Sequence, residues 1–267
     1  MNTIPNLNRI TIYPIKSLDG ISLEKAVISE GGCLLHDREY AMFDEKGELI
    51  NGKSNPLVHS LRTAFDFDKE TVSFRLNNDM PWNEFHLVNE KSEIEVFLSA
   101  HFRMKVQIQQ NKTGRFLDVP DISGVTVLSE ASLQTVADWF SISLDESRKR
   151  FRATLEFVNV TPFWEDKLFL EKGRVLELKI GDVTVFGMSP RPRCVVPSRN
   201  PETASITRAF SKKFSKKREN NLVESSNLMN YGHSYHLSVD CLIPATEVGK
   251  SIRLGDKLTI IGEKENE

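Results

Sequence analysis

Cysteine is scarce in this sequence, with three residues among 267, and all of them lie far apart. Cys33, Cys194 and Cys241 form no CxxC pair, so neither a disulfide framework nor a structural zinc site is expected. The chain also lacks the cysteine quartet of an iron–sulfur cluster and the glycine-rich loop of a nucleotide site. Any cysteine chemistry is therefore expected from a single sulfur.

Long apolar runs and a charge excess are absent too. No stretch approaches the roughly 20 apolar residues that cross a bilayer, and the opening MNTIPNLNRI lacks a signal pattern. We therefore expect a cytoplasmic protein with no membrane partner. Thirty-five Lys and Arg stand against 37 Asp and Glu, giving a net charge of −2. This balance argues against nucleic acid as a partner, because nucleic-acid binding uses a large positive field.

Alternation of apolar and polar residues dominates the first hundred positions and predicts half-buried strands. It occurs at residues 9–15, 39–43, 71–76 and 84–88, with turn residues between the segments. These short strands favour an antiparallel barrel or sandwich. Helical spacing of apolar residues predicts one helix over residues 92–101.

A polar stretch at residues 109–121 indicates a domain boundary or a long exposed loop. A strand is expected at residues 124–128, followed by a helix with Ser129 as its N-cap. A second helix is expected to begin at Ser143, whose partner Glu146 completes a capping box.

The remainder returns to strands. The segments LELKIGDVTVFG (176–187) and KSIRLGDKLTIIG (250–262) each place Gly-Asp between alternating apolar residues, as a tight hairpin or bulge requires. The predicted class is mostly β with α (α+β).

One strongly basic run occupies residues 206–218, where Phe210 and Phe214 lie four positions apart. The first interpretation is a solvated helix that packs through its two Phe side chains. The alternative is a docking patch for an acidic redox partner or an anionic substrate.

The densest cluster of unusual residues is SPRPRCVVPSRNPETA, at 189–204. Cys194 follows Arg191 and Arg193, and adjacent cations stabilise the thiolate that attacks electrophiles or binds soft metals. The alternative is a buried structural cysteine beside arginines that serve salt bridges. Cys33 and Cys241 stand in apolar contexts and are expected in the core.

Possible anion donors lie in two further segments. Lys16 and Ser17 follow the first predicted strand, where an ammonium and a hydroxyl can hold a phosphate. Arg38 is expected within a strand, facing either outward or into a barrel mouth.

A third segment, Arg150 to Thr154, is expected at the entry to a strand. Alternation then places Arg150, Arg152 and Thr154 on one face. Donors from these distant segments suggest a fork that holds a phosphate or a pterin-like anion.

Six motifs in order resemble MOSC proteins that carry an N-terminal β-barrel domain. They are YPIKSLDG at Tyr13, LHDREYAMFD at Leu35, VTVLSEASL at Val125, RFRATLEF at Arg150, WEDKL at Trp164 and RPRCVVPSRNPET at Arg191. The amidoxime-reducing component, its bacterial relatives and the C-terminal part of molybdenum cofactor sulfurase belong to this group. The resemblance covers nearly the whole chain. It implies an N-terminal antiparallel β-barrel domain at residues 1–115 and a MOSC β-barrel domain with a few flanking helices at 116–267.

The resemblance also implies a molybdenum cofactor (molybdopterin) whose metal is bound by one cysteine. The position that matches this ligand, and that would be catalytic, is Cys194. The cofactor-binding positions that match are Lys16, Ser17, Arg38, Ser123, Arg152 and Thr154.

The implied function is an oxidoreductase that reduces N-hydroxylated or N-oxide-type small molecules. Its electrons would come from a separate redox protein of the cytochrome or ferredoxin/flavin reductase type. The wider superfamily is also associated with pyridoxal phosphate binding and sulfur transfer. Two alternatives stay open: a sulfur carrier with a persulfide on Cys194, and an inactive binding protein of MOSC fold.

Three departures from the family pattern bear on these alternatives. RFRPN reads RFRAT here, so Thr154 replaces an amide side chain, and DPDTG reads NPETA with Asn200 and Ala204. Near the C-terminus, Ser234 stands where an aromatic is usual, although Tyr231 or Tyr235 can substitute. The metal ligand Cys194 is unaffected.

Overall fold

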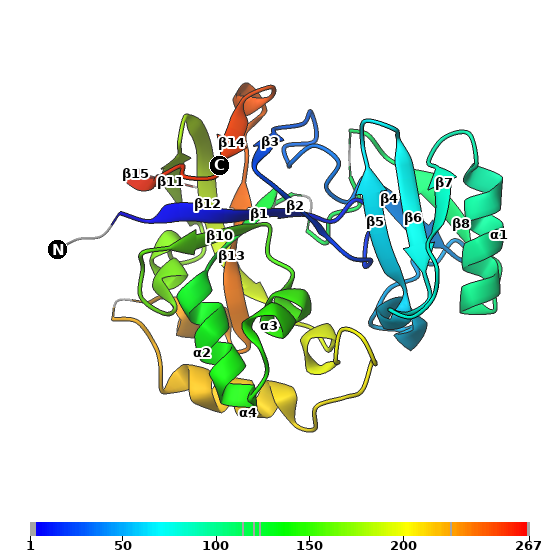
Figure 1. Ribbon diagram of the computed structural model, residues 1–267. Helices are drawn as coiled ribbons and strands as arrows, with labels where there is room; N and C mark the ends of the chain where they lie inside the picture. The colour runs from blue at the N-terminus through cyan, green and yellow to red at the C-terminus, as the bar shows by residue number, and fades with distance from the viewer. Residues whose placement is uncertain (1–3, 114, 120, 123, 225, 266–267) are drawn as a thin grey trace.

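The computed structural model describes residues 4–113, 115–119, 121–122, 124–224 and 226–265. Strands make up 33% of the described residues and helices 24%, which confirms the mostly β class with α. Figure 1 shows a larger part, which contains the helices α2, α3 and α4, beside a smaller part that contains α1. Two separate clusters of buried apolar side chains form the main cores of these parts.

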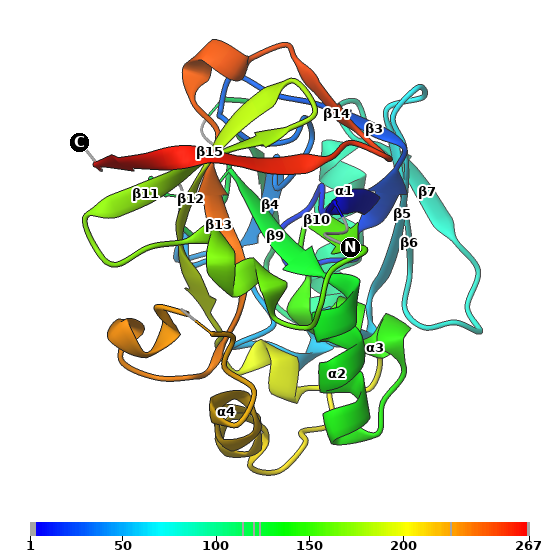
Figure 2. The ribbon, with the colours of Figure 1, turned by 90° about the vertical axis from the view of Figure 1, so that its left-hand side faces the viewer.

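The larger part is built on an eight-stranded sheet. Its order is β15 (Leu258–Glu265), β11 (Arg174–Ile180), β12 (Val183–Pro192), β13 (His236–Leu242), β9 (Val125–Ser129), β10 (Leu155–Val158), β1 (Asn6–Ile12) and β2 (Ile21–Leu23). The β9–β10 pair is parallel and the other pairs are antiparallel. As described, the strand order has two ends, β15 and β2, so these strands form no closed ring. Figure 2 shows β15 crossing the sheet at one end.

Three smaller sheets complete the β structure. They are β3 (Lys25–Val27) with β14 (Ser251–Arg253), β4 (Tyr40–Phe43) with β8 (Gln107–Gln110), and β5 (Arg62–Asp66) with β6 (Thr71–Arg75) and β7 (Asn83–His86). Helix α1 (Lys91–Phe102) agrees closely with its predicted range and buries Ile94, Leu98 and Phe102 in the core of the smaller part. The apolar spacing of this helix was therefore a reliable signal.

Helices α2 (Glu130–Phe140) and α3 (Leu144–Phe151) begin where the sequence predicted. The Ser129 and Ser143 side chains accept the backbone N–H groups of Ser132 and Glu146, each at 3.0 Å. These caps satisfy amide groups that the first helical turn leaves unpaired.

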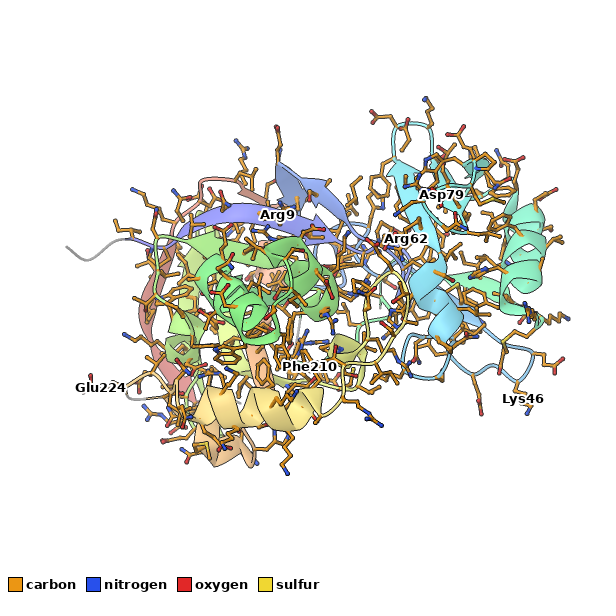
Figure 3. The ribbon with its side chains drawn as sticks, turned by 60° about the horizontal axis from the view of Figure 1, so that its bottom comes forward. Arg9, Lys46, Arg62, Asp79, Phe210 and Glu224 are labelled. Atoms are coloured by element: carbon orange, nitrogen blue, oxygen red, sulfur yellow. The ribbon has the colours of Figure 1, made fainter. Side chains whose placement is uncertain are left out.

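Helix α4 (Phe210–Glu219) buries Phe210 and Phe214, which confirms the expected packing of the basic run. Figure 3 shows Phe210 directed from α4 toward the body of the larger part. The four lysines of the helix are exposed: Lys212, Lys213, Lys216 and Lys217.

Short 3-10 helices connect the main elements. They are η1 (Pro56–Ser60), η2 (Trp164–Leu168), η3 (Val196–Ser198), η4 (Leu228–Tyr231) and η5 (Ala245–Glu247). None of the helices formed by the described residues has both the length and the apolar character that crossing a membrane requires.

Several predicted strands were wrong in detail. The first strand ends at Ile12 rather than Ile15, and Arg38 lies in a turn before β4 with φ 50°. The segment after Arg150 does not alternate as a strand. Phe151 ends α3 and Arg152 is its left-handed C-cap, so the chain changes direction before β10 begins at Leu155. A helix end thus separates Thr154 from Arg150 and Arg152, with which simple alternation had placed it on one face.

The two Gly-Asp segments also differ. Gly181 (φ 56°) and Asp182 form the expected tight hairpin between β11 and β12. Gly255 (φ 91°) instead joins β14 to β15, which pair with β3 and β11 and not with each other. The hairpin expected at the second segment was therefore wrong.

The N-terminal strands contact elements from far along the chain. β1 pairs with β10, and β3 pairs with β14, so residues before 115 contribute strands to two sheets that also contain strands from after it. The proposed division at residue 115 stays a prediction.

Candidate functional site

Cys194 lies just after β12, in the short connection to η3. Its side chain is exposed, and its Sγ accepts the backbone N–H of Val196 at 3.4 Å. Cys33 and Cys241 are fully buried, as expected of core residues. Burial raises the pKa of both of these thiols. Cys194 is thus the accessible sulfur of the three.

The Cys194 thiol faces a cleft of about 740 Å³. Residues from both parts of the molecule line this cleft, and Arg62 on β5 marks the junction in Figure 3. Five of the seven predicted cofactor-binding residues line it, namely Lys16, Ser17, Arg38, Arg152 and Cys194, and so do Arg150, Arg191 and Arg193. Segments up to about 180 positions apart in the chain therefore meet at one cavity.

Lys16 enters the cleft from the connection that follows β1. Its backbone N–H donates to the carbonyl of Tyr40, which ties this connection to β4. Its Nζ lies 2.8 Å from Asp118 Oδ1 and donates to the carbonyl of Phe116 at 2.7 Å. Burial lowers the pKa of Lys16 although Asp118 opposes the shift, so the ammonium is partly desolvated.

Arg38 and Arg152 both lie over the ring of Tyr13. Their guanidinium carbons are 4.6 Å and 4.0 Å from the ring centre. Arg38 pairs with the fully buried carboxylate of Asp37, and Arg152 donates to the carbonyl of Leu18 at 2.7 Å. Burial lowers the pKa of Arg152, whereas Asp37 overcomes burial and raises the pKa of Arg38.

Three of the candidate residues hold a left-handed backbone. The φ angles are 76° at Ser17, 50° at Arg38 and 53° at Arg152. Such values cost free energy for residues with a Cβ and cluster at functional sites. At Arg38 the conformation is held by the backbone N–H, which donates to the Tyr13 carbonyl at 2.9 Å.

Arg191 and Arg193, which flank the cysteine, are engaged with the protein. Arg191 pairs with Asp118 at 2.8 Å and with the buried Asp240. Arg193 donates to the carbonyl of Phe151. Burial and the neighbouring Arg191 lower the pKa of Arg193 to about 10, so it stays charged at neutral pH. These two arginines contribute to the positive charge of the cleft.

One predicted cofactor-binding residue, Thr154, is not brought to the cleft in this way. Thr154 is buried, and its hydroxyl accepts the backbone N–H of Thr126 at 2.7 Å. It fixes the start of β10 against β9 and is not among the residues that line the cleft. Ser123 lies outside the described residues.

For other residues at the site, the sequence offered little or no indication of a functional role. Asp118 belongs to the polar stretch taken as a boundary, and its ion pairs join residues about 100 and 70 positions away. Tyr235 donates its hydroxyl to the Cys194 carbonyl at 3.2 Å, so of the two aromatics suggested near Ser234 it is the one beside the cysteine. Tyr231 instead donates to the carbonyl of Leu170.

The described residues contain no group of three His, Cys, Asp or Glu side chains that could hold a metal ion. A metal in this cleft would therefore take at most two such ligands from the described residues, with its other ligands supplied by a bound organic group. The thiol of Cys194 is the side chain with that chemistry.

The family model of the MOSC N-terminal beta barrel domain matches residues 4–147, more than half of the sequence. The chain belongs to this family, which confirms the resemblance found in the motifs.

Among curated proteins, mitochondrial amidoxime reducing component 2 of Bos taurus is 23% identical over 247 residues, covering 78% of this chain and 70% of that protein. The molybdenum cofactor sulfurase of Oryza sativa subsp. japonica is 36% identical over 63 residues, which span 24% of this chain and 8% of that protein. A solved structure, the YUAD protein from Bacillus subtilis, has a TM-score of 0.37 at 9% identity, covering 97% of this chain and 94% of that chain.

Proposed function

We propose that this protein binds the molybdenum cofactor in the cleft and acts as an oxidoreductase on N-hydroxylated or N-oxide-type small molecules. The observation that carries the proposal is the exposed Cys194 thiol at a cleft whose other matching residues are mainly cationic. A thiolate is a suitable soft metal ligand, and ammonium and guanidinium groups suit a phosphate. The name of the bovine relative supports the choice of reaction.

The residues present fit such a group. A cleft of about 740 Å³ lies within the usual range for bound small molecules. Cys194 would ligate the metal, and Lys16, Ser17, Arg38 and Arg152 would hold the pterin and its phosphate. When bound, the cofactor supplies the redox change of its metal, while this chain supplies ligation, orientation and electrostatics. Thr154 would act indirectly, by fixing the strand that follows Arg152.

Charge balance supports an anionic ligand. Five cations gather at this side of the cleft, namely Lys16, Arg38, Arg152, Arg191 and Arg193. Three carboxylates accompany them, Asp37, Asp118 and Asp240. Cations also exceed carboxylates over the whole lining, with twelve Lys and Arg against five Asp and Glu, so an anionic ligand is favoured.

Electrons would come from a separate redox protein of the cytochrome or ferredoxin/flavin reductase type. Three cysteines, two of them buried, cannot bind a four-cysteine iron–sulfur cluster within these residues. The exposed lysines of α4 offer a surface that attracts an acidic partner.

The test is quantification of molybdenum and pterin in protein purified from a host that makes the cofactor. Wild type should contain both, and Cys194→Ser should lose the molybdenum while its circular dichroism stays unchanged, because the side chain is exposed. Cys33→Ala removes a thiol away from the cleft lining and should keep the metal. Equal molybdenum in wild type and Cys194→Ser would refute the proposed ligand.

Sulfur transfer is the second candidate function. It is favoured by the accessibility of Cys194 and by the Val196 N–H, which can stabilise a negative charge on a persulfide. Cyanolysis of the purified protein distinguishes the two functions. Sulfane sulfur that disappears in Cys194→Ser, in a protein free of molybdenum, would favour the carrier.

A further inference from the structure

Asp118 holds two cations of the cleft, one with each carboxylate oxygen. Oδ1 lies 2.8 Å from Lys16 Nζ, and Oδ2 lies 2.8 Å from Arg191 Nη2. The Asp118 side chain is 50% exposed, whereas those of Lys16 and Arg191 are 14% and 16% exposed. The carboxylate is therefore more accessible to solvent than the two cations that it binds.

Both cations have a second partner that is deeper in the protein. Arg191 also pairs with Asp240, which is 2% exposed, and Lys16 also donates to the Phe116 carbonyl. Each cation thus keeps a hydrogen-bond acceptor when Asp118 turns away. Although burial opposes the shift, Lys16 and Arg191 hold the pKa of Asp118 well below its usual range, so a ligand that displaces this carboxylate must offer the two cations a stronger charge.

The backbone near Asp118 is fastened, and its half-exposed side chain is held by the two ion pairs. The Phe116 N–H donates to the Arg38 carbonyl at 2.9 Å, and its ring lies 5.6 Å from that of Phe43. These contacts anchor the chain two residues before Asp118. Rotation of the Asp118 side chain into solvent can therefore open the two cations without moving the connection.

We propose that Asp118 is an internal counter-ion that competes with the ligand for Lys16 and Arg191, and that a phosphate-type dianion displaces its carboxylate on binding. The inference rests on the proposed use of the cleft for a phosphate-bearing ligand. A dianion with three acceptor oxygens replaces the single carboxylate favourably. A neutral or weakly charged ligand does not, so Asp118 restricts this subsite to strongly anionic groups.

The test uses inorganic phosphate as the probe and the full chain expressed in a host that lacks cofactor synthesis. Binding is measured by isothermal titration calorimetry at low ionic strength. Asp118→Asn should bind phosphate about ten times more tightly than wild type, because the competing charge is gone. Glu202→Gln is the matched control, since Glu202 lines the same cleft, is also 50% exposed and pairs with Lys149. Its phosphate affinity should equal that of wild type.

Lys16→Ala separates failure of this inference from failure of the proposed site. If Lys16→Ala weakens phosphate binding but Asp118→Asn equals wild type, the site stands and the competing role of Asp118 is overturned. Weaker binding by Asp118→Asn also overturns it, since Asp118 would then hold the donors in place. No phosphate binding by any variant, with Tm values that show folded protein, removes both the inference and the anion site.

Discussion

The guanidinium carbon of Arg152 lies 4.0 Å from the centre of the Tyr13 ring, although the two residues are 139 positions apart. The same ring supports Arg38, and its hydroxyl donates to the Ala153 carbonyl at 3.4 Å. A Cβ at Gly20 would lie only 2.7 Å from the ring, so glycine lets the chain pass beside it. Tyr13 thus joins the connection after β1 to the end of α3.

Truncating Tyr13 should destabilise the protein and loosen both arginines. Tyr13→Ala is expected to cost roughly 3–5 kcal/mol of unfolding free energy, the range for large buried aromatics. Tyr13→Phe keeps the ring under both guanidinium groups and should lose only about 1 kcal/mol. Urea denaturation of the three proteins measures both values. Equal losses for the two variants would show that the hydroxyl, not the ring, is the main contribution.

Thiol labelling should distinguish Cys194 from the other cysteines. One equivalent of a thiol reagent is expected to react quickly with the native protein, because Cys194 is exposed while Cys33 and Cys241 are fully buried. After unfolding in guanidinium chloride, three equivalents should react. Native Cys194→Ser should show no fast phase, and a remaining fast equivalent would mean that a buried thiol is accessible.

The buried pair of Arg218 and Asp166 should be strongly coupled. Their side chains are 1% and 5% exposed, and the guanidinium carbon of Arg218 lies 4.0 Å from the centre of the Phe163 ring. Arg218→Met leaves the Asp166 charge without its partner and should cost about 3–5 kcal/mol. Arg218→Met/Asp166→Asn should cost clearly less than the sum of the single changes. Additive losses in urea denaturation would rule out this coupling.

Glu165 should make the protein less stable as the pH rises from about 4.5 to about 7. Burial, with the neighbouring charge of Asp166, raises the pKa of Glu165 to about 7, although the Ser132 hydroxyl donates to it at 2.9 Å. The native state therefore keeps a proton that the unfolded chain has already released, and stability falls across this range by on the order of 3 kcal/mol.

Glu165→Gln tests this pH dependence, because the amide stays neutral at every pH. The variant should match wild type in urea denaturation at pH 4.5 and exceed it at pH 8. The difference between the two proteins isolates Glu165 from other titrating groups, such as His236, whose pKa burial lowers to about 4. A difference that does not change with pH would contradict the prediction.

Sequence patterns that span only a few residues were sufficient to predict much of the fold. The caps Ser129 and Ser143, the spacing of α1 and the packing of Phe210 and Phe214 are all present in the structure. They succeed because a cap or an amphipathic face depends on neighbours one to four positions away. The boundaries of helices and strands were predicted less accurately, as the early end of β1 at Ile12 shows.

The sequence alone determined the mostly β class, the family and the segments that supply the cleft, since its motifs and periodicity are local. Only the tertiary structure decided which side chains meet. A left-handed helix cap sends Arg152 into the cleft and leaves Thr154 in the core, and Asp118 reaches Lys16 about 100 positions away. Such pairs depend on how strands distant in the chain come together, and that is set by burial of the whole core rather than by any short segment.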